Sequence, residues 1–417
     1  MHANPSSRDE RPRAEDAPIT AGDLAGRLEG LIPIGLSERG TNRLAWTPED
    51  RRAQMWFMEQ AAGVGLRAER DPAGNLWALP PGDGPWWVVA SHLDTVRDGG
   101  RLDGALGVAA GFAIARASSS PIAVVSFADE EGARFNTPTF GSRWLTGRLD
   151  VADVLQRTDE HGVELRQAFE AAGLTAEGLG QASAGLDRVL GVIELHIDQS
   201  LDVDASGQPA GIVTALASRL RMSADIIGRA DHSGTTRRGE RADALAAGAR
   251  LIVAALDLAP DDPDFMVTAS RIIVEPNAAT TIPARVRLWL DARSPEREQL
   301  VDWQQALEAL AQDVARRGGV ELRLDVASQG PGVAFDLGVN AALREASERL
   351  GHPAPAVVCF AGHDAGIVAP HRPAGMVLVR NATGVSHSPA EHVELEDAAY
   401  AANVVLTAVE RLISVAP

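Results

Sequence analysis

The chain has 417 residues, 57 of them acidic and 39 basic, which gives a formal net charge of -18. This excess of acid disfavours a nucleic-acid backbone or an anionic membrane surface as partner, and no apolar run approaches the ~18 residues of a membrane span. The single cysteine excludes an intrachain disulfide, so we expect a cytoplasmic protein. Residues 1–20 are polar, lack the apolar core of a signal peptide and are expected to form a flexible tail.

The first half of the chain alternates between strand and helix patterns. Residues 21–65 are predicted to be helical, with Thr47-Pro48 as a helix start. Short apolar runs and one small-residue run then predict strands at 75–79, 86–90, 122–127 and 189–195, a helix at 107–117 and mostly helical structure at 146–185. Continuous apolar strands separated by helices indicate a mostly parallel, doubly wound α/β sheet that is covered on both faces.

A different order of elements begins near residue 212. The pattern predicts strands at 213–227, 266–275, 283–291 and 319–326 and helices at 240–258 and 295–317, which is the β-α-β-β-α-β order of a ferredoxin-like unit. Helix and strand alternation returns with helices at 338–350 and 394–414 and strands at 355–359 and 375–380. We therefore expect a catalytic domain formed by 21–211 and 329–417, interrupted by an inserted α+β lid domain at 212–328.

Side chains that bind metals follow the apolar runs. They are His92, Asp103, Glu130, Glu131, His196 and His387. Because the carboxyl ends of parallel strands meet at one edge of a sheet, the fold can gather these residues at a single site. Two-metal hydrolases need such a set, in which one carboxylate bridges the metals and one acid moves a proton. Asp94, two residues after His92, can hold the second ring nitrogen of that histidine.

Each of these residues also has a plainer interpretation. His92 can be an incidental loop histidine, and Asp103 before a glycine can simply belong to a turn. The pair Glu130-Glu131 can be a solvated acidic turn, although two adjacent acids repel each other unless a cation compensates. His196 can be a satisfied core histidine. Their joint placement at strand ends favours the two-metal interpretation over these separate ones.

Eight segments carry a resemblance to a known family. In order they are SHLDTVRDGGRLDGALGV, SFADEEGARF, ELHIDQ, HSGTT, PNAATTIP, LDAR, AGHDA and SHSPAEH. The chain resembles, from about Gly40 to its C-terminus, the amidase and hydantoinase–carbamoylase family of di-metal amidohydrolases. That family includes N-carbamoyl-L-amino acid hydrolases, allantoate amidohydrolases and β-ureidopropionases, and it is related to the aminoacylase and carboxypeptidase-type zinc enzymes.

The resemblance implies roles for the metal-binding residues. Asp103 would bridge two divalent metal ions, zinc or manganese, with cobalt or nickel as substitutes in vitro. His92 and His196 would complete one metal site, and Glu131 and His387 the other. Glu130 would act as general base toward a water that the metals activate, and would return the proton to the leaving nitrogen.

Substrate recognition is also implied by the resemblance. His232 would stabilise the oxyanion across a homodimer interface formed by the lid. Asn277 and Arg293 would bind the substrate carboxylate, for which the planar guanidinium is suited, while Gln199 and Gly362 would line the pocket.

Several residues depart from the family pattern, among them Asp198 and Ser200, which flank Gln199 where Glu and Gly are usual. Phe360 precedes the AGHDA segment where glycine is typical, and this residue would narrow the pocket. Arg237 and Arg238 stand where Pro-Met is usual. They would either favour an extra anionic group on the substrate or form a solvated basic loop.

The expected function is therefore metal-dependent hydrolysis of the C–N bond of an N-carbamoyl amino acid or a related ureido acid, a small-molecule substrate. An N-acyl-L-amino acid deacylase or dipeptidase would use the same site. A metal-binding scaffold without turnover is a rival from another class, and Glu130 argues against it because such a scaffold needs no proton carrier.

Overall fold

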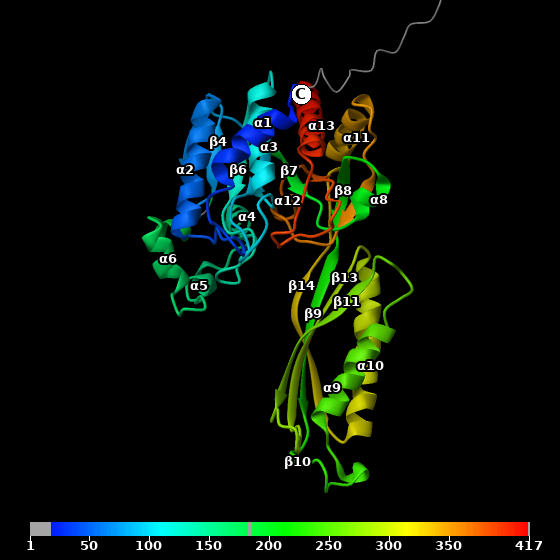
Figure 1. Ribbon diagram of the computed structural model, residues 1–417. Coiled ribbons are helices and arrows are strands. Elements are labelled where there is room, and N and C mark those ends of the chain that lie inside the picture. The colour runs from blue at the N-terminus through cyan, green and yellow to red at the C-terminus, as the bar shows by residue number, and fades with distance from the viewer. Residues whose placement is uncertain (1–17, 182, 184, 416–417) are drawn as a thin grey trace, which may run out of the picture. The chain divides into compact units, whose positions relative to one another are not determined.

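The computed structural model describes residues 18–181, 183 and 185–415 (Figure 1). Residues 1–17 of the predicted tail lie outside this part, whereas Ile19 is buried and its N–H donates to Asn403 Oδ1 at 3.2 Å. The chain divides into two compact units. The first contains the described residues up to Thr214, Ala334–Val357 and those from Ala361 onward, and the second contains Ala215–Val333 and Val358–Phe360.

A mixed sheet forms the centre of the first unit. In the described part of the chain nine strands join it, and its middle consists of four parallel strands. Their order is β17 (Ala374–Val379), β7 (Val189–Ile197), β5 (Trp86–His92) and β6 (Ile122–Phe127). Antiparallel β4 (Leu76–Leu79) and β3 (Arg67–Arg70) extend one side, and β8 (Ala210–Leu216), β15 (Val333–Ala334) and β16 (Ala356–Cys359) extend the other. The prediction of a mostly parallel α/β sheet is confirmed.

Helices cover both faces of this sheet (Figure 1). One face packs against α1 (Ala21–Leu31), α2 (Pro48–Gly63), α3 (Ala105–Ala117), α11 (Leu337–Arg349) and α13 (Leu395–Ser414). The other packs against α4 (Phe140–Leu145) and α12 (Asp364–Val368). Between β7 and β8 lies the short α8 (Asp202–Ser206). Small side chains make α3 a close partner of the sheet, since a Cβ on Gly107 would meet the Leu195 carbonyl oxygen at 2.0 Å.

Two predicted helical stretches are wrong in part. Residues 32–47 interrupt the predicted helix 21–65 and form the small hairpin of β1 (Leu36–Ser37) and β2 (Gly40–Thr41). The buried Arg43 fixes this segment, because its Nε donates to the Leu93 carbonyl at 2.9 Å. The described part of 146–185 is helical at α5 (Val151–Val154), α6 (Leu165–Ala171) and α7 (Ala176–Leu179), with turns and loops between them, and these helices close over a separate apolar cluster.

The second unit is an antiparallel sheet with two helices on one face (Figure 1). Its strand order is β11 (Met266–Glu275), β13 (Arg285–Ser294), β9 (Ser218–Ile227) and β14 (Glu321–Gly330), which is the ferredoxin-like order. Alternate residues of β9 and β13 pack against α9 (Ala244–Asp257) and α10 (Arg297–Gly318). A short ladder of β10 (Asp231–His232) and β12 (Thr281–Ile282) stands apart. Among the described helices, none has the length and apolar character that crossing a membrane requires.

Candidate active site

The predicted metal-binding residues of the first unit come together at the carboxyl ends of its parallel strands. His92 ends β5, His196 lies near the end of β7, and Glu130 and Glu131 follow β6. His387 comes from the loop before α13. Parallel strands present their carboxyl ends at one edge, so residues far apart in sequence converge there.

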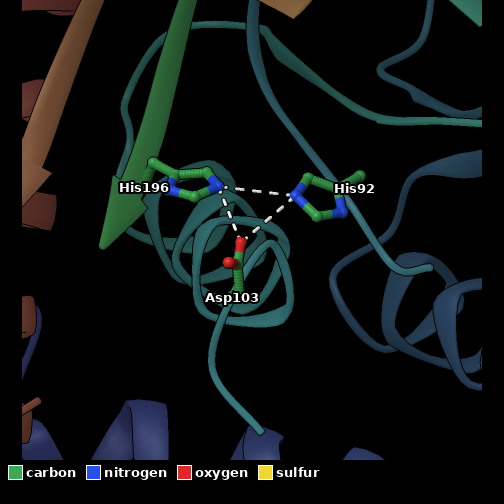
Figure 2. A group of neighbouring side chains, drawn as sticks. All are labelled: His92, Asp103 and His196. Carbon is green, nitrogen blue, oxygen red and sulfur yellow. Dashed lines mark hydrogen bonds and ion pairs between the residues drawn. The ribbon is translucent and has the colours of Figure 1, made fainter. Parts of the chain in front are cut away.

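Two histidines and one aspartate form the inner group, and their side chains point toward one another (Figure 2). Asp103 Oδ1 lies 2.8 Å from His196 Nε2 and 3.4 Å from His92 Nε2, and the two Nε2 atoms are 3.4 Å apart. The other ring nitrogens face backbone carbonyls, His92 Nδ1 that of Asp94 and His196 Nδ1 that of Ile197, each at 3.0 Å. Since each Nδ1 can donate to a carbonyl, both Nε2 atoms are available to a cation.

A second group shares Asp103 with the first. His387 Nε2 lies 3.6 Å from Asp103 Oδ2 and 3.3 Å from Glu131 Oε2. The two oxygens of Asp103 therefore face different groups, as a bridging carboxylate would. Glu130 belongs to a third overlapping group, with its Oε2 3.9 Å from His92 Nε2.

The electrostatics of this cluster fit divalent cations. Asp103 is buried, and its Oδ1 faces the Nε2 atoms of both His196 and His92. Burial raises the pKa of Glu130 well above its usual value, and burial together with Asp103 raises that of Glu131 to about 8. Burial lowers the pKa of His196, but the neighbouring Asp103 outweighs it and raises it overall, so a cation binding there must displace a proton. Histidine nitrogens and carboxylate oxygens are a donor set that zinc and manganese accept.

Two further acids hold the backbone around this cluster. The Asp94 carboxylate accepts the N–H groups of Glu130 and Glu131, each at 3.1 Å, and lies 3.7 Å from His92 Nδ1. Its main contacts are thus with the two glutamates, and its backbone carbonyl takes the closer position at His92. Glu391, which the sequence analysis did not single out, accepts the N–H groups of Leu102 and Asp103 at 2.6 and 3.0 Å. Its only sequence signal is its place in the SHSPAEH segment.

A glycine lets Asp103 approach the histidines. Gly104 has a φ of +67°, and a Cβ built on it would lie 2.5 Å from Cε1 and Nδ1 of His92. A side chain at this position would displace the imidazole, so the backbone here is shaped by the site as well as by the helix that follows.

A buried layer behind the histidines was also missed. His363 meets His196 edge to face with ring centroids 4.5 Å apart, and Glu194 accepts the Ala365 N–H at 2.7 Å. Burial and the nearby His196 lower the pKa of His363 well below its usual value, so this ring is neutral. The AGHDA segment was the available signal for this layer.

The other sequence-predicted residues fall in different places. Gln199 joins the cluster, with its Nε2 3.3 Å from both Asp103 Oδ2 and Ser386 Oγ. Gly362 follows β16 in the first unit. His232, Asn277 and Arg293 belong to the second unit.

In the second unit, His232 is exposed and its Nδ1 accepts the Gly234 N–H at 3.0 Å, so a neutral ring carries its proton on Nε2. Arg293 donates from Nε to Asp291 Oδ1 at 2.8 Å and from Nη1 to the Phe360 carbonyl at 2.5 Å. Asn277 is exposed after β11. Exposed side chains are also found at both of the unusual arginines, Arg237 and Arg238.

A doubly wound sheet that gathers histidines and carboxylates at its strand ends is typical of metal-dependent hydrolases. Comparison with known proteins agrees, since residues 88–411 match the family model described as peptidase family M20/M25/M40. The chain belongs to this family, and it is a hydrolase that acts on carbon–nitrogen bonds.

Relatives and solved structures confirm the resemblance found in the sequence. The N-carbamoyl-L-amino acid amidohydrolase of Geobacillus stearothermophilus is 35% identical and covers 93% of this chain and 97% of its own. The allantoate amidohydrolase of Bacillus subtilis is 33% identical, with coverage of 88% and 91%. A hydantoinase/carbamoylase family amidase from Burkholderia multivorans superimposes with a TM-score of 0.84 at 30% identity, over 94% of this chain and 97% of that one.

Proposed function

We propose that this protein hydrolyses the C–N bond of an N-carbamoyl amino acid or a related ureido acid, as a cytoplasmic enzyme with two divalent cations. The observation that supports this most directly is Asp103, whose two carboxylate oxygens face separate groups of possible ligands. His92 and His196 would hold one cation with it, and Glu131 and His387 the other. The names of the relatives, N-carbamoyl-L-amino acid amidohydrolase and allantoate amidohydrolase, favour a ureido group as the target.

Glu130 is the proposed general base. Two bound cations would polarise the ureido carbonyl and lower the pKa of an attacking water. Glu130 is buried and lies beside His92. In the described part of the chain it forms no ion pair with arginine or lysine that would hold it in the carboxylate form. It would take a proton from the water and give it to the leaving nitrogen. For a carbamoyl substrate, one water then converts the ureido acid into an amino acid, carbon dioxide and ammonia.

Residues of both units would position the substrate. His232 would donate from Nε2 to the oxyanion. The Gly234 N–H donates to His232 Nδ1, and this hydrogen bond favours the tautomer with the proton on Nε2. Asn277 and Arg293 would bind the carboxylate, and the bonds of Arg293 to Asp291 and Phe360 use its Nε and Nη1. Gln199 and Gly362 would line the pocket, and the second unit would form a homodimer through which His232 reaches the partner's site.

A panel of substrates tests the proposal. Protein loaded with zinc or manganese is incubated with N-carbamoyl-L-amino acids, allantoate, β-ureidopropionate and N-acetyl-L-amino acids, and products are identified by mass spectrometry. Release of ammonia that a chelator abolishes is the expected result. Deacetylation alone would indicate the N-acyl-amino acid deacylase, which the broad peptidase family also allows.

A variant separates chemistry from metal binding. Glu130→Gln should reduce kcat by at least about 100-fold, because it removes the proton carrier, while retaining two metals per chain. The exposed Glu177→Gln serves as the control and should match the wild type. Equal activity of Glu130→Gln and wild type would contradict the proposed base.

A further inference from the structure

Two arginines stand side by side on the open face of the second unit's sheet. Arg219 on β9 and Arg293 on β13 are direct register partners in the antiparallel ladder. Directly opposed residues of an antiparallel pair place their side chains on the same face, with Cβ atoms ~5 Å apart. The next pair of the ladder on the same face is Arg221 and Asp291, so this end of the sheet carries three arginines and one aspartate on one face.

That carboxylate is already occupied. Asp291 accepts from Arg221 Nε through Oδ2 at 2.6 Å and from Arg293 Nε through Oδ1 at 2.8 Å. Three cations and one anion leave an excess of positive charge at this end of the sheet, in a protein whose formal net charge is -18. Burial, followed by the charges of Arg221 and Arg293, lowers the pKa of Arg219. An anion placed between these groups would relieve their repulsion.

Among these three arginines, Arg219 is the one with a buried donor that lacks a hydrogen-bond partner. Its Nε is buried and has no hydrogen-bond partner among the described residues. Its other neighbour in the sheet is Gly330 of β14, where a Cβ would meet no described atom within 4 Å. On the β14 side of Arg219, therefore, the register partner has no side chain and open space lies above it. A buried donor left unpaired costs free energy, which a bound anion would recover.

We propose that Arg219 and Arg293 form a paired-guanidinium site that selects ureido acids with a second anionic group, such as an acidic amino-acid side chain. Arg293 would hold the α-carboxylate and Arg219 the second carboxylate. This inference rests on the proposed function, in which Arg293 binds the substrate carboxylate. It assigns the extra-anion preference to Arg219, whereas the exposed Arg237 and Arg238 have no comparable unpaired, buried donor in the described structure.

An isosteric pair of substrates tests the site. The ratio of kcat/KM for N-carbamoyl-L-glutamate over N-carbamoyl-L-glutamine is measured for wild type, Arg219→Gln, Arg219→Lys and Arg250→Gln. We expect wild type to prefer the glutamate compound and Arg219→Gln to lower the ratio by about 10-fold or more, mainly through KM, because a hydrogen bond between charged groups is lost. Arg219→Lys should keep part of the preference. Arg250 is an exposed arginine of α9, so its variant reports the effect of one lost charge alone.

Binding of products to chelated protein makes the test independent of turnover. By calorimetry, wild type should bind L-glutamate more tightly than L-glutamine, and Arg219→Gln should lose that difference while unfolding at the wild-type temperature. An unchanged ratio in Arg219→Gln, or an equal fall in Arg250→Gln, would overturn the site. If no ureido compound is hydrolysed but glutamate binding still depends on Arg219, the proposed function fails and the anion site stands.

Discussion

The close contact between Gly104 and His92 makes a quantitative prediction for Gly104→Ala. A carbon contact needs ~3.5 Å, and the new Cβ would lie 2.5 Å from the imidazole, so His92 must retreat by roughly 1 Å. A displacement of that size in an active site costs about 100-fold in rate. The positive φ of Gly104 adds ~1–2 kcal/mol of backbone strain in the variant.

The assay compares two variants that both place alanine at a positive φ. Gly207 has a φ of +69°, and a Cβ there would meet no described atom within 4 Å, so Gly207→Ala controls for the positive φ without the collision. We measure kcat/KM and the metal retained after dialysis, with circular dichroism as the check on folding. Gly104→Ala should lose about 100-fold in kcat/KM and part of its metal, whereas Gly207→Ala should lose only stability. Equal kcat/KM and metal content in the two variants would refute the reasoning.

Three more perturbations follow from the buried acids. Glu391→Ala removes the acceptor for two backbone N–H groups at Asp103, at a cost of ~1–3 kcal/mol for each unpaired donor; it should weaken metal binding in a calorimetric titration, and unchanged affinity would contradict a positioning role. Burial raises the pKa of Asp50 to about 7, so the stability it contributes below the unfolded pKa of ~3.9 is lost as pH rises toward 7. Urea denaturation of the metal-free protein should therefore show a fall of up to about 4 kcal/mol in the free energy of unfolding over this pH range, and Asp50→Asn should lack this fall. If the pH dependence of the two proteins is parallel, the raised pKa of Asp50 is wrong. Chelation should lower the unfolding temperature, more at pH 9 than at pH 6, because the pKa of Glu131 is about 8 without a cation; a constant difference would argue against charge repulsion in the empty cluster.

The central strands could be predicted because their side chains are buried on both faces of the sheet, which requires an uninterrupted run of apolar residues. Strand β6 begins and ends at the predicted residues, Ile122 and Phe127, since every side chain in it is buried. The hairpin near Leu36 could not, because its conformation depends on the distant contact between Arg43 and the Leu93 carbonyl. The ferredoxin-like unit was predictable from the order of its strands and helices, and its two inner strands, β9 and β13, also alternate between buried and more exposed residues.

The same distinction applies to the site. Residues that would act through their side-chain chemistry, such as His92 and His196, can be recognised by type and by position after a strand. Glu391 acts through backbone N–H groups 288 and 289 residues away, which have no residue-specific signature. Arg219 was also missed, because its significance depends on a cross-strand register that only the folded sheet defines.

The insertion of the second unit has a consequence for how the protein can vary. The chain leaves the first unit after Thr214 and returns at Ala334, and the Phe335 N–H donates to the Thr214 carbonyl at 3.0 Å. The first unit's sheet therefore holds the two ends of the segment Ala215–Val333 together, so this segment is connected to that sheet as a long loop would be. Because loop-closure entropy grows only with the logarithm of length, this loop can be lengthened, shortened or exchanged at little energetic expense. With the roles proposed for His232, Asn277 and Arg293, an exchange of this segment would change the substrate range, while the strand ends that carry His92 and His196 keep their register.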